Sequence, residues 1–128
     1  MKAPESASVP PATVVVPLNV LLKPREIAYH LKDSDAVALI AFEGTAELPI
    51  AQMAQAALAD APACGRLIVI TLDPTAPGPV DGAMTFAQMM HGQSPVSETH
   101  PTRATDTAVM LYTSGTTGQP KGAELSHL

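Results

Sequence analysis

The residues best suited to chemistry are gathered in one short stretch, YTSGTTGQPKG, at positions 112–122. Its eleven residues include three glycines, three threonines, one serine and one lysine. Glycine allows backbone conformations that other residues avoid, and it removes side chains that would keep a ligand away from the backbone. Backbone N–H groups in such a turn form a hollow that binds anions, and the hydroxyls and the ammonium group add further donors. The stretch therefore predicts a binding loop for a polyphosphate.

Eight residues are the candidate phosphate contacts. They comprise hydroxyl side chains, glycines and one cation: Thr113, Ser114, Gly115, Thr116, Thr117, Gly118, Lys121 and Gly122. The spacing differs from the P-loop, in which glycine and lysine are adjacent and a serine or threonine follows. The residues after the loop, 123–125, predict a returning strand. No helix N-terminus is therefore expected beneath the phosphate.

Four apolar runs predict the strands that position this loop, at residues 13–19, 36–42, 66–72 and 107–113. Because the runs are continuously apolar rather than alternating, they favour a parallel sheet buried on both faces. Proline at a first helical turn predicts helices over 24–33 and from 49 to 60, and Thr85 is expected to cap a short third helix. The predicted fold class is α/β, with a mostly parallel sheet and helices on both faces.

Spacing within the helices predicts which side chains are buried. Ile27 and Leu31 lie four residues apart on one face of the first helix, and His30 is expected at its polar border. The apolar stripe of the second helix contains Ile50, Met53, Ala57 and Leu58. We interpret this stripe as a packing face rather than as a ligand site.

Composition limits the classes of function. The chain has 128 residues, 46% of them hydrophobic, which is enough for one domain, while residues 1–12 predict a loose tail. A net charge of -5 and the lack of a basic patch argue against a nucleic-acid partner. Cys64 is the only cysteine, which excludes an internal disulfide, favours a cytoplasmic protein and predicts a small core residue. No apolar run is long enough to span a bilayer. His91, Glu98 and His100 lack a recognised ligand spacing, so no metal site is predicted.

The loop resembles the phosphate-binding signature of the AMP-forming acyl-adenylating enzymes. This family includes acyl-CoA synthetases, aryl-CoA ligases, luciferases and peptide-synthetase adenylation domains. The signature Tyr-Thr-Ser-Gly-Thr-Thr-Gly-x-Pro-Lys-Gly is matched at every fixed position from Tyr112 to Gly122. Residues 14–40 resemble the strand, helix and strand that acyl-CoA ligases have upstream of this loop. Pro17-Leu18-Asn19 stands where peptide synthetases usually have Pro-Ile-Asp, which favours a CoA ligase.

The resemblance implies a two-step activation of a carboxylic acid. The carboxylate attacks the α-phosphate of ATP, pyrophosphate leaves, and the thiol of CoA then attacks the acyl-adenylate. Residues 113–121 would grip the β- and γ-phosphates, and Lys121 would offset charge on the departing pyrophosphate. Tyr112 would help to seat the loop rather than react. The implied small molecules are ATP, Mg²⁺, CoA and a carboxylic acid.

Several motifs of the family are absent from this sequence. They are the later Tyr-Gly-x-Thr-Glu motif, whose glutamate holds magnesium, the ribose-binding aspartate, the hinge and the catalytic lysine of the small C-terminal domain. We therefore expect residues 13–128 to form part of an AMP-binding domain that is not catalytically complete alone. We also expect self-association through an exposed sheet edge. Three alternatives stay open: a nucleotide-binding module without catalysis, a remnant without function, and an aryl-CoA ligase in place of a fatty-acid–CoA ligase.

Overall fold

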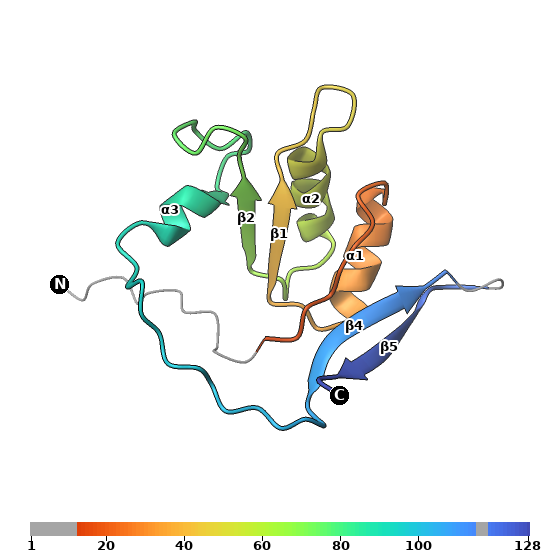
Figure 1. The fold of residues 1–128 in the computed structure, drawn as a ribbon. Coiled ribbons are helices and arrows are strands. Elements are labelled where there is room, and N and C mark those ends of the chain that lie inside the picture. The colour runs from red at the N-terminus through yellow and green to blue at the C-terminus, as the bar shows by residue number, and fades with distance from the viewer. Residues whose placement is uncertain (1–12, 115–117) are drawn as a thin grey trace. The chain divides into compact units, whose positions relative to one another are not determined.

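The computed structural model describes residues 13–114 and 118–128 of the chain. The tail predicted at residues 1–12 and the loop residues Gly115, Thr116 and Thr117 lie outside the described residues. The chain divides into two compact units (Figure 1). Leu18–Ser94 form the first, here called the sheet unit. The second, called the ribbon unit, comprises the described residues of Met1–Pro17 and Pro95–Leu128.

The sheet unit contains a parallel sheet of three strands. β1 (Ala38–Phe42), β2 (Arg66–Ile70) and β3 (Met84–Thr85) lie side by side in that order, and both pairs are parallel. The accompanying helices are α1 (Pro24–Asp33), α2 (Ile50–Ala59) and α3 (Phe86–Met90). In Figure 1, α2 lies to the right of β1 and α3 to the left of β2. The predicted α/β class and parallel sheet are thus confirmed.

Alanine side chains bring α2 close to the sheet. Ala51, Ala54 and Ala57 are at most 2% exposed, whereas the larger residues of the predicted stripe, Ile50, Met53 and Leu58, are half-buried. Ala51 and Ala54 pack in one cluster with strand residues, and Ala57 packs against α1 in another. Ile50, Met53 and Leu58 also pack against these two clusters, so the predicted packing face is confirmed, although Ala51 and Ala54 are more deeply buried than they are. Small side chains fill those positions because they let the helix backbone approach its neighbours.

The buried face of α1 includes a polar residue. Ile27 and Leu31 are buried, as predicted. His30 is only 4% exposed, so its expected place at the polar border was wrong. Its Nδ1 donates to the carbonyl oxygen of Glu26 at 2.7 Å, and its ring meets Tyr29 edge-on. This hydrogen bond offsets the cost of burying a polar ring.

Two further sequence predictions are confirmed in the sheet unit. The Thr85 hydroxyl accepts from the Gln88 amide at 3.1 Å, and the Gln88 side chain accepts in return from the Thr85 amide at 2.9 Å. This reciprocal pair caps α3. Cys64 is buried among core residues, and its burial raises the pKa of the thiol. A protonated, buried thiol suits a packing role.

The strand predicted at residues 13–19 was wrong. Only Val15 makes a β-bridge, a parallel one with Val109, and the side chains of Val14 and Val15 are 42% and 55% exposed. Pro17 has no N–H to donate, and it restricts the backbone of the residue before it. The apolar run therefore does not extend as a paired strand.

The fourth predicted strand has the expected bounds but a different partner. β4 (Thr107–Thr113) pairs antiparallel with β5 (Lys121–Ser126), so the two form a separate two-stranded sheet, here called the ribbon. The predicted returning strand after the loop is confirmed, whereas the single sheet of four strands was wrong. A continuous apolar run does not by itself distinguish a strand of a buried parallel sheet from a strand of a ribbon.

Gly44 provides a test of how tightly the turn after β1 is built. Its φ is 90°, and an added Cβ would collide with the Leu48 carbonyl oxygen and the Ile50 amide nitrogen. Because these are backbone atoms, no rotamer change relieves the collision. We predict that Gly44→Ala lowers the free energy of unfolding by about 2–4 kcal/mol, measured by urea denaturation followed by circular dichroism.

Gly65→Ala is the matched control, because a Cβ at Gly65 has no neighbour within 4 Å. We expect this change to alter the free energy of unfolding by less than about 1 kcal/mol. Equal losses in the two variants would show that the turn at Gly44 can relax.

Candidate functional site

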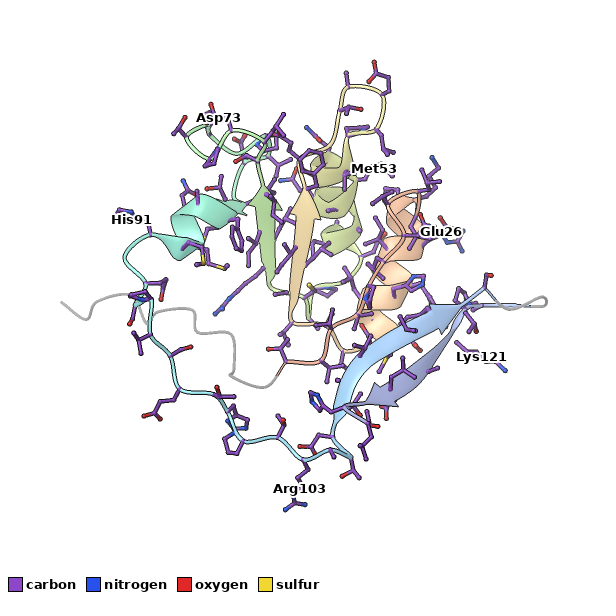
Figure 2. All side chains as sticks on the ribbon, viewed as in Figure 1. Glu26, Met53, Asp73, His91, Arg103 and Lys121 are labelled. Atoms are coloured by element: carbon purple, nitrogen blue, oxygen red, sulfur yellow. The ribbon has the colours of Figure 1, made fainter. Side chains whose placement is uncertain are left out.

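The candidate site is the end of the ribbon from which the glycine-rich loop extends. Across the strands, Thr113 pairs with Lys121, Tyr112 with Gly122 and Leu111 with Ala123. The Thr113 hydroxyl donates to the carbonyl oxygen of Lys121 at 3.4 Å, a long bond at the last pair before the loop. We call this last pair the neck of the loop, and Lys121 is one of its two residues (Figure 2).

β4 is hydrogen-bonded along both edges near its middle. The Val15 amide donates to the Ala108 carbonyl at 3.0 Å, and the Met110 amide donates to the Val15 carbonyl at 2.9 Å. β5 occupies the other edge. Just before the strand, the Asp106 carboxylate accepts from the Arg103 amide at 2.8 Å and closes a turn. The start and middle of β4 are thus fixed by main-chain contacts, and from Leu111 to Thr113 the ladder with β5 continues to the loop.

Two glycines of the site are required for different reasons. Gly118 has φ 103°, and a Cβ added there would meet no atom within 4 Å, so its glycine serves the backbone conformation rather than space. At Gly122 the reverse holds. An added Cβ would lie 3.1 Å from Met110 Sδ and 3.2 Å from Tyr112 Cζ, so side chains from β4 pack directly over it.

The structure describes five of the eight predicted phosphate contacts. They share exposed positions in or beside the loop: Thr113, Ser114, Gly118, Lys121 and Gly122. Their exposure suits a charged ligand, since the ammonium group keeps its hydration until the ligand arrives. Gly115, Thr116 and Thr117 lie outside the described residues. The binding roles of all eight residues stay predictions.

The sequence analysis missed Met110. The Tyr112 hydroxyl donates to Met110 Sδ at 3.5 Å, and both side chains cover Gly122. The alternation of a strand places residues 110 and 112 on the same face of the ribbon. That period, counted back from Tyr112, was the signal that identifies Met110 as a neighbour of the loop.

Other groups of polar residues form no comparable site. Within residues 13–114 and 118–128, no group of three His, Cys, Asp or Glu side chains could hold a metal ion. The Asp73 carboxylate accepts hydrogen bonds from the Thr75 hydroxyl at 2.7 Å and from its amide at 2.9 Å. These bonds, the hydroxyl first, lower the pKa of this exposed carboxyl group. Asp73 therefore closes a surface turn.

The sheet unit also contains a small apolar cavity. Its volume is about 110 Å³, and it lies between β1, α2 and residues 18–20. Ligand pockets usually have volumes of about 300–1,000 Å³ and a few convergent polar groups. This cavity is smaller and mostly apolar, so the loop end of the ribbon remains the better candidate site.

Comparisons with known proteins identify the family of this chain. The family model described as "AMP-binding enzyme" matches residues 12–128. The mitochondrial acyl-coenzyme A synthetase ACSM2 of Rattus norvegicus is 30% identical over 114 residues, which is 89% of this chain. The nonribosomal peptide synthetase verP of Clonostachys rogersoniana is 41% identical over 56 residues, or 38% of this chain.

Solved structures extend this similarity to the fold. The crystal structure of the anthranilate CoA ligase AuaEII, in complex with anthranoyl-AMP, matches 89% of this chain with a TM-score of 0.74 and 30% identity. The chain spans 20% of that ligase, 18% of the rat synthetase and 3% of the peptide synthetase. Since the family model covers nearly all of the sequence, the chain belongs to the AMP-binding enzyme family.

Proposed function

We propose that this chain contributes the phosphate-binding segment of an ATP-dependent acyl-CoA synthetase of the fatty-acid–CoA ligase type. The observation behind the proposal is the position of Lys121, which pairs with Thr113 at the neck of an exposed, glycine-rich loop. The similarity to a rat acyl-coenzyme A synthetase supports the class of reaction. The chain spans about a fifth of the length of the rat synthetase and of AuaEII. The acyl-CoA synthetase activity is therefore part of this proposal.

In the proposed reaction the loop binds and orients the polyphosphate of ATP. Backbone N–H groups and the Ser114 hydroxyl donate to the β- and γ-phosphates, and the Thr113 hydroxyl exchanges its long bond to the Lys121 carbonyl oxygen for one to a phosphate oxygen. The carboxylate of the acid displaces pyrophosphate from the α-phosphate, and Lys121 Nζ offsets the negative charge on the leaving group. No bond forms between the protein and the phosphate. Catalysis by this segment would therefore consist of positioning and charge stabilisation.

Magnesium and CoA enter the proposal through the family only. The described residues lack a cluster of three metal-ligating side chains, so we assign magnesium no ligand among them. We likewise assign CoA no contact in this chain. The roles proposed above are those of residues 113–122 toward the ATP phosphates.

One observation favours a second class of acid. AuaEII, whose structure is similar to this chain, is an anthranilate CoA ligase. An aryl-CoA ligase is therefore the second candidate. A panel of aliphatic and aromatic acids, offered to a synthetase that contains this segment, separates the two classes by the acid that supports adenylation.

Partners and location complete the proposal. None of the helices in the described part of the chain is long and apolar enough to cross a membrane. A cytoplasmic location stays a prediction from the single cysteine.

Self-association also stays a prediction, supported by β1 at the edge of its sheet and by the 54% and 40% exposure of Ile40 and Phe42. A single monomeric species in sedimentation velocity would contradict it.

The first test measures pyrophosphate binding to the chain. Because adenine and ribose contacts are not part of the proposed segment, we expect a millimolar dissociation constant, which corresponds to about 4 kcal/mol. Lys121→Ala should weaken binding by about tenfold or more, and added salt should weaken the wild type. A ³¹P NMR titration at two salt concentrations measures both effects.

Lys32→Ala is the control for this titration, because it removes an exposed lysine from α1 in the other unit. We expect its affinity to equal that of the wild type. If the two lysine variants bind equally well, Lys121 has no special role and the proposal fails.

The second test concerns catalysis. Because the sequence lacks the magnesium, ribose and C-terminal lysine motifs of the family, we predict that the chain alone does not form acyl-adenylate. Exchange of labelled pyrophosphate into ATP, measured with a panel of fatty acids, should stay at the level of Lys121→Ala. Exchange clearly above that level would mean that the chain is catalytically complete.

A further inference from the structure

The ribbon poses the question of what sets its register. Every residue of β5 is exposed, so no buried face aligns this strand with its partner. The register of a two-stranded ribbon with an exposed, glycine-containing strand is weakly specified, and a slip of one residue turns every side chain to the opposite face. Some local contact must therefore select the observed pairing.

The contact that can do so lies at the pair of Tyr112 and Gly122. The Tyr112 ring and the Met110 thioether both lie over Gly122, within 3.2 Å of the position that a Cβ would occupy. The Tyr112 hydroxyl donates to Met110 Sδ at 3.5 Å, which holds the two side chains together. Sulfur and an aromatic ring attract each other by up to about 1.5 kcal/mol. Aromatic side chains are known to cover a glycine across a strand pair.

The sequence of β5 allows only one position for this contact. A slip of one residue would place Lys121 or Ala123 opposite Tyr112, and a slip of two would place Pro120 or Glu124 there. Each of these four residues has a Cβ in the space that the ring and the thioether occupy. Gly122 alone, among residues 120–124, leaves that space open.

We propose that Tyr112, Met110 and Gly122 form a ring clasp that fixes the register of the ribbon and so holds Lys121 at the neck of the phosphate loop. The three are positioning residues, and their proposed effect on phosphate binding rests on the proposed function. Lys121 is adjacent to Gly122, so its side chain projects from the opposite face of the ribbon. The clasp thus occupies one face and leaves the ammonium group on the other.

The test uses the full chain and a set of matched variants. Gly122→Ala adds a methyl group beneath the clasp, and Met110→Ala, made in the wild type, removes the thioether that covers Gly122. Tyr112→Phe keeps the ring and removes the hydroxyl. Ala123→Gly is the control, because Ala123 pairs with Leu111 on the opposite face of the ribbon.

The first measurement is the register itself, in the absence of phosphate. Nuclear Overhauser effects between the aromatic ring at position 112 and the Gly122 α-protons should be present in the wild type, in Tyr112→Phe and in Ala123→Gly. In Gly122→Ala the pairing of Thr113 with Lys121 should be lost or shifted, and Met110→Ala, which removes one member of the clasp, should weaken it. An unchanged pairing in Gly122→Ala would overturn the clasp.

The second measurement is the affinity for pyrophosphate. Gly122→Ala should weaken binding by about tenfold and lose the salt dependence that Lys121 provides, and Met110→Ala should weaken binding by about threefold. Tyr112→Phe should stay within about twofold. Equal weakening by Ala123→Gly and Gly122→Ala would overturn the clasp, because it would indicate a general loss of ribbon stability. If the wild type does not bind pyrophosphate, the proposed function fails, and the register measurement still decides the clasp.

Discussion

The pairing of Thr113 with Lys121 is the constraint on which the candidate site depends. It brings the two ends of the glycine-rich loop together and places the lysine at the point where the loop ends and β5 begins. A lysine in a flexible segment would contribute charge without a fixed position, and a fixed position is what separates a binding site from a general attraction of anions. The pairing is itself supported by a main-chain bridge at Val15 and by the side chains over Gly122.

The two units are stabilised in different ways. In the sheet unit, alanines of α2 pack tightly, and the turn after β1 requires a glycine because backbone atoms surround it. In the ribbon unit, β5 is exposed throughout, so contacts between side chains paired across the two strands stabilise the ribbon in place of a buried core. Glycine illustrates the difference. Gly44 avoids a collision with backbone, Gly122 makes room for side chains, and Gly118 permits a left-handed turn.

Much of this organisation could be predicted from the sequence. The bounds of β4, the α1 helix, the cap at Thr85 and the returning strand follow from local rules of strand, helix and turn chemistry. The family could be inferred as well, because the loop signature is long and its positions are fixed. These features depend on neighbouring residues, which a sequence displays directly.

The parts that could not be predicted depend on tertiary contacts. The run at residues 13–19 is as apolar as a strand, yet Pro17 and the lack of a partner leave it with a single bridge. His30 is buried because its ring nitrogen finds a carbonyl one turn away on α1. The loop signature predicts the phosphate contacts but does not point to Met110, whose contact with Gly122 becomes apparent only when β4 and β5 are paired.

The central claim is that residues 112–122 bind the β- and γ-phosphates of ATP. An amide NMR titration of the chain with pyrophosphate, ATP and AMP tests it most directly. The account predicts that pyrophosphate and ATP shift the amide signals of the loop and of Lys121, and that AMP leaves them unchanged. Shifts confined to other residues, or an AMP response as large as that to pyrophosphate, would contradict the claim that this segment is a phosphate loop.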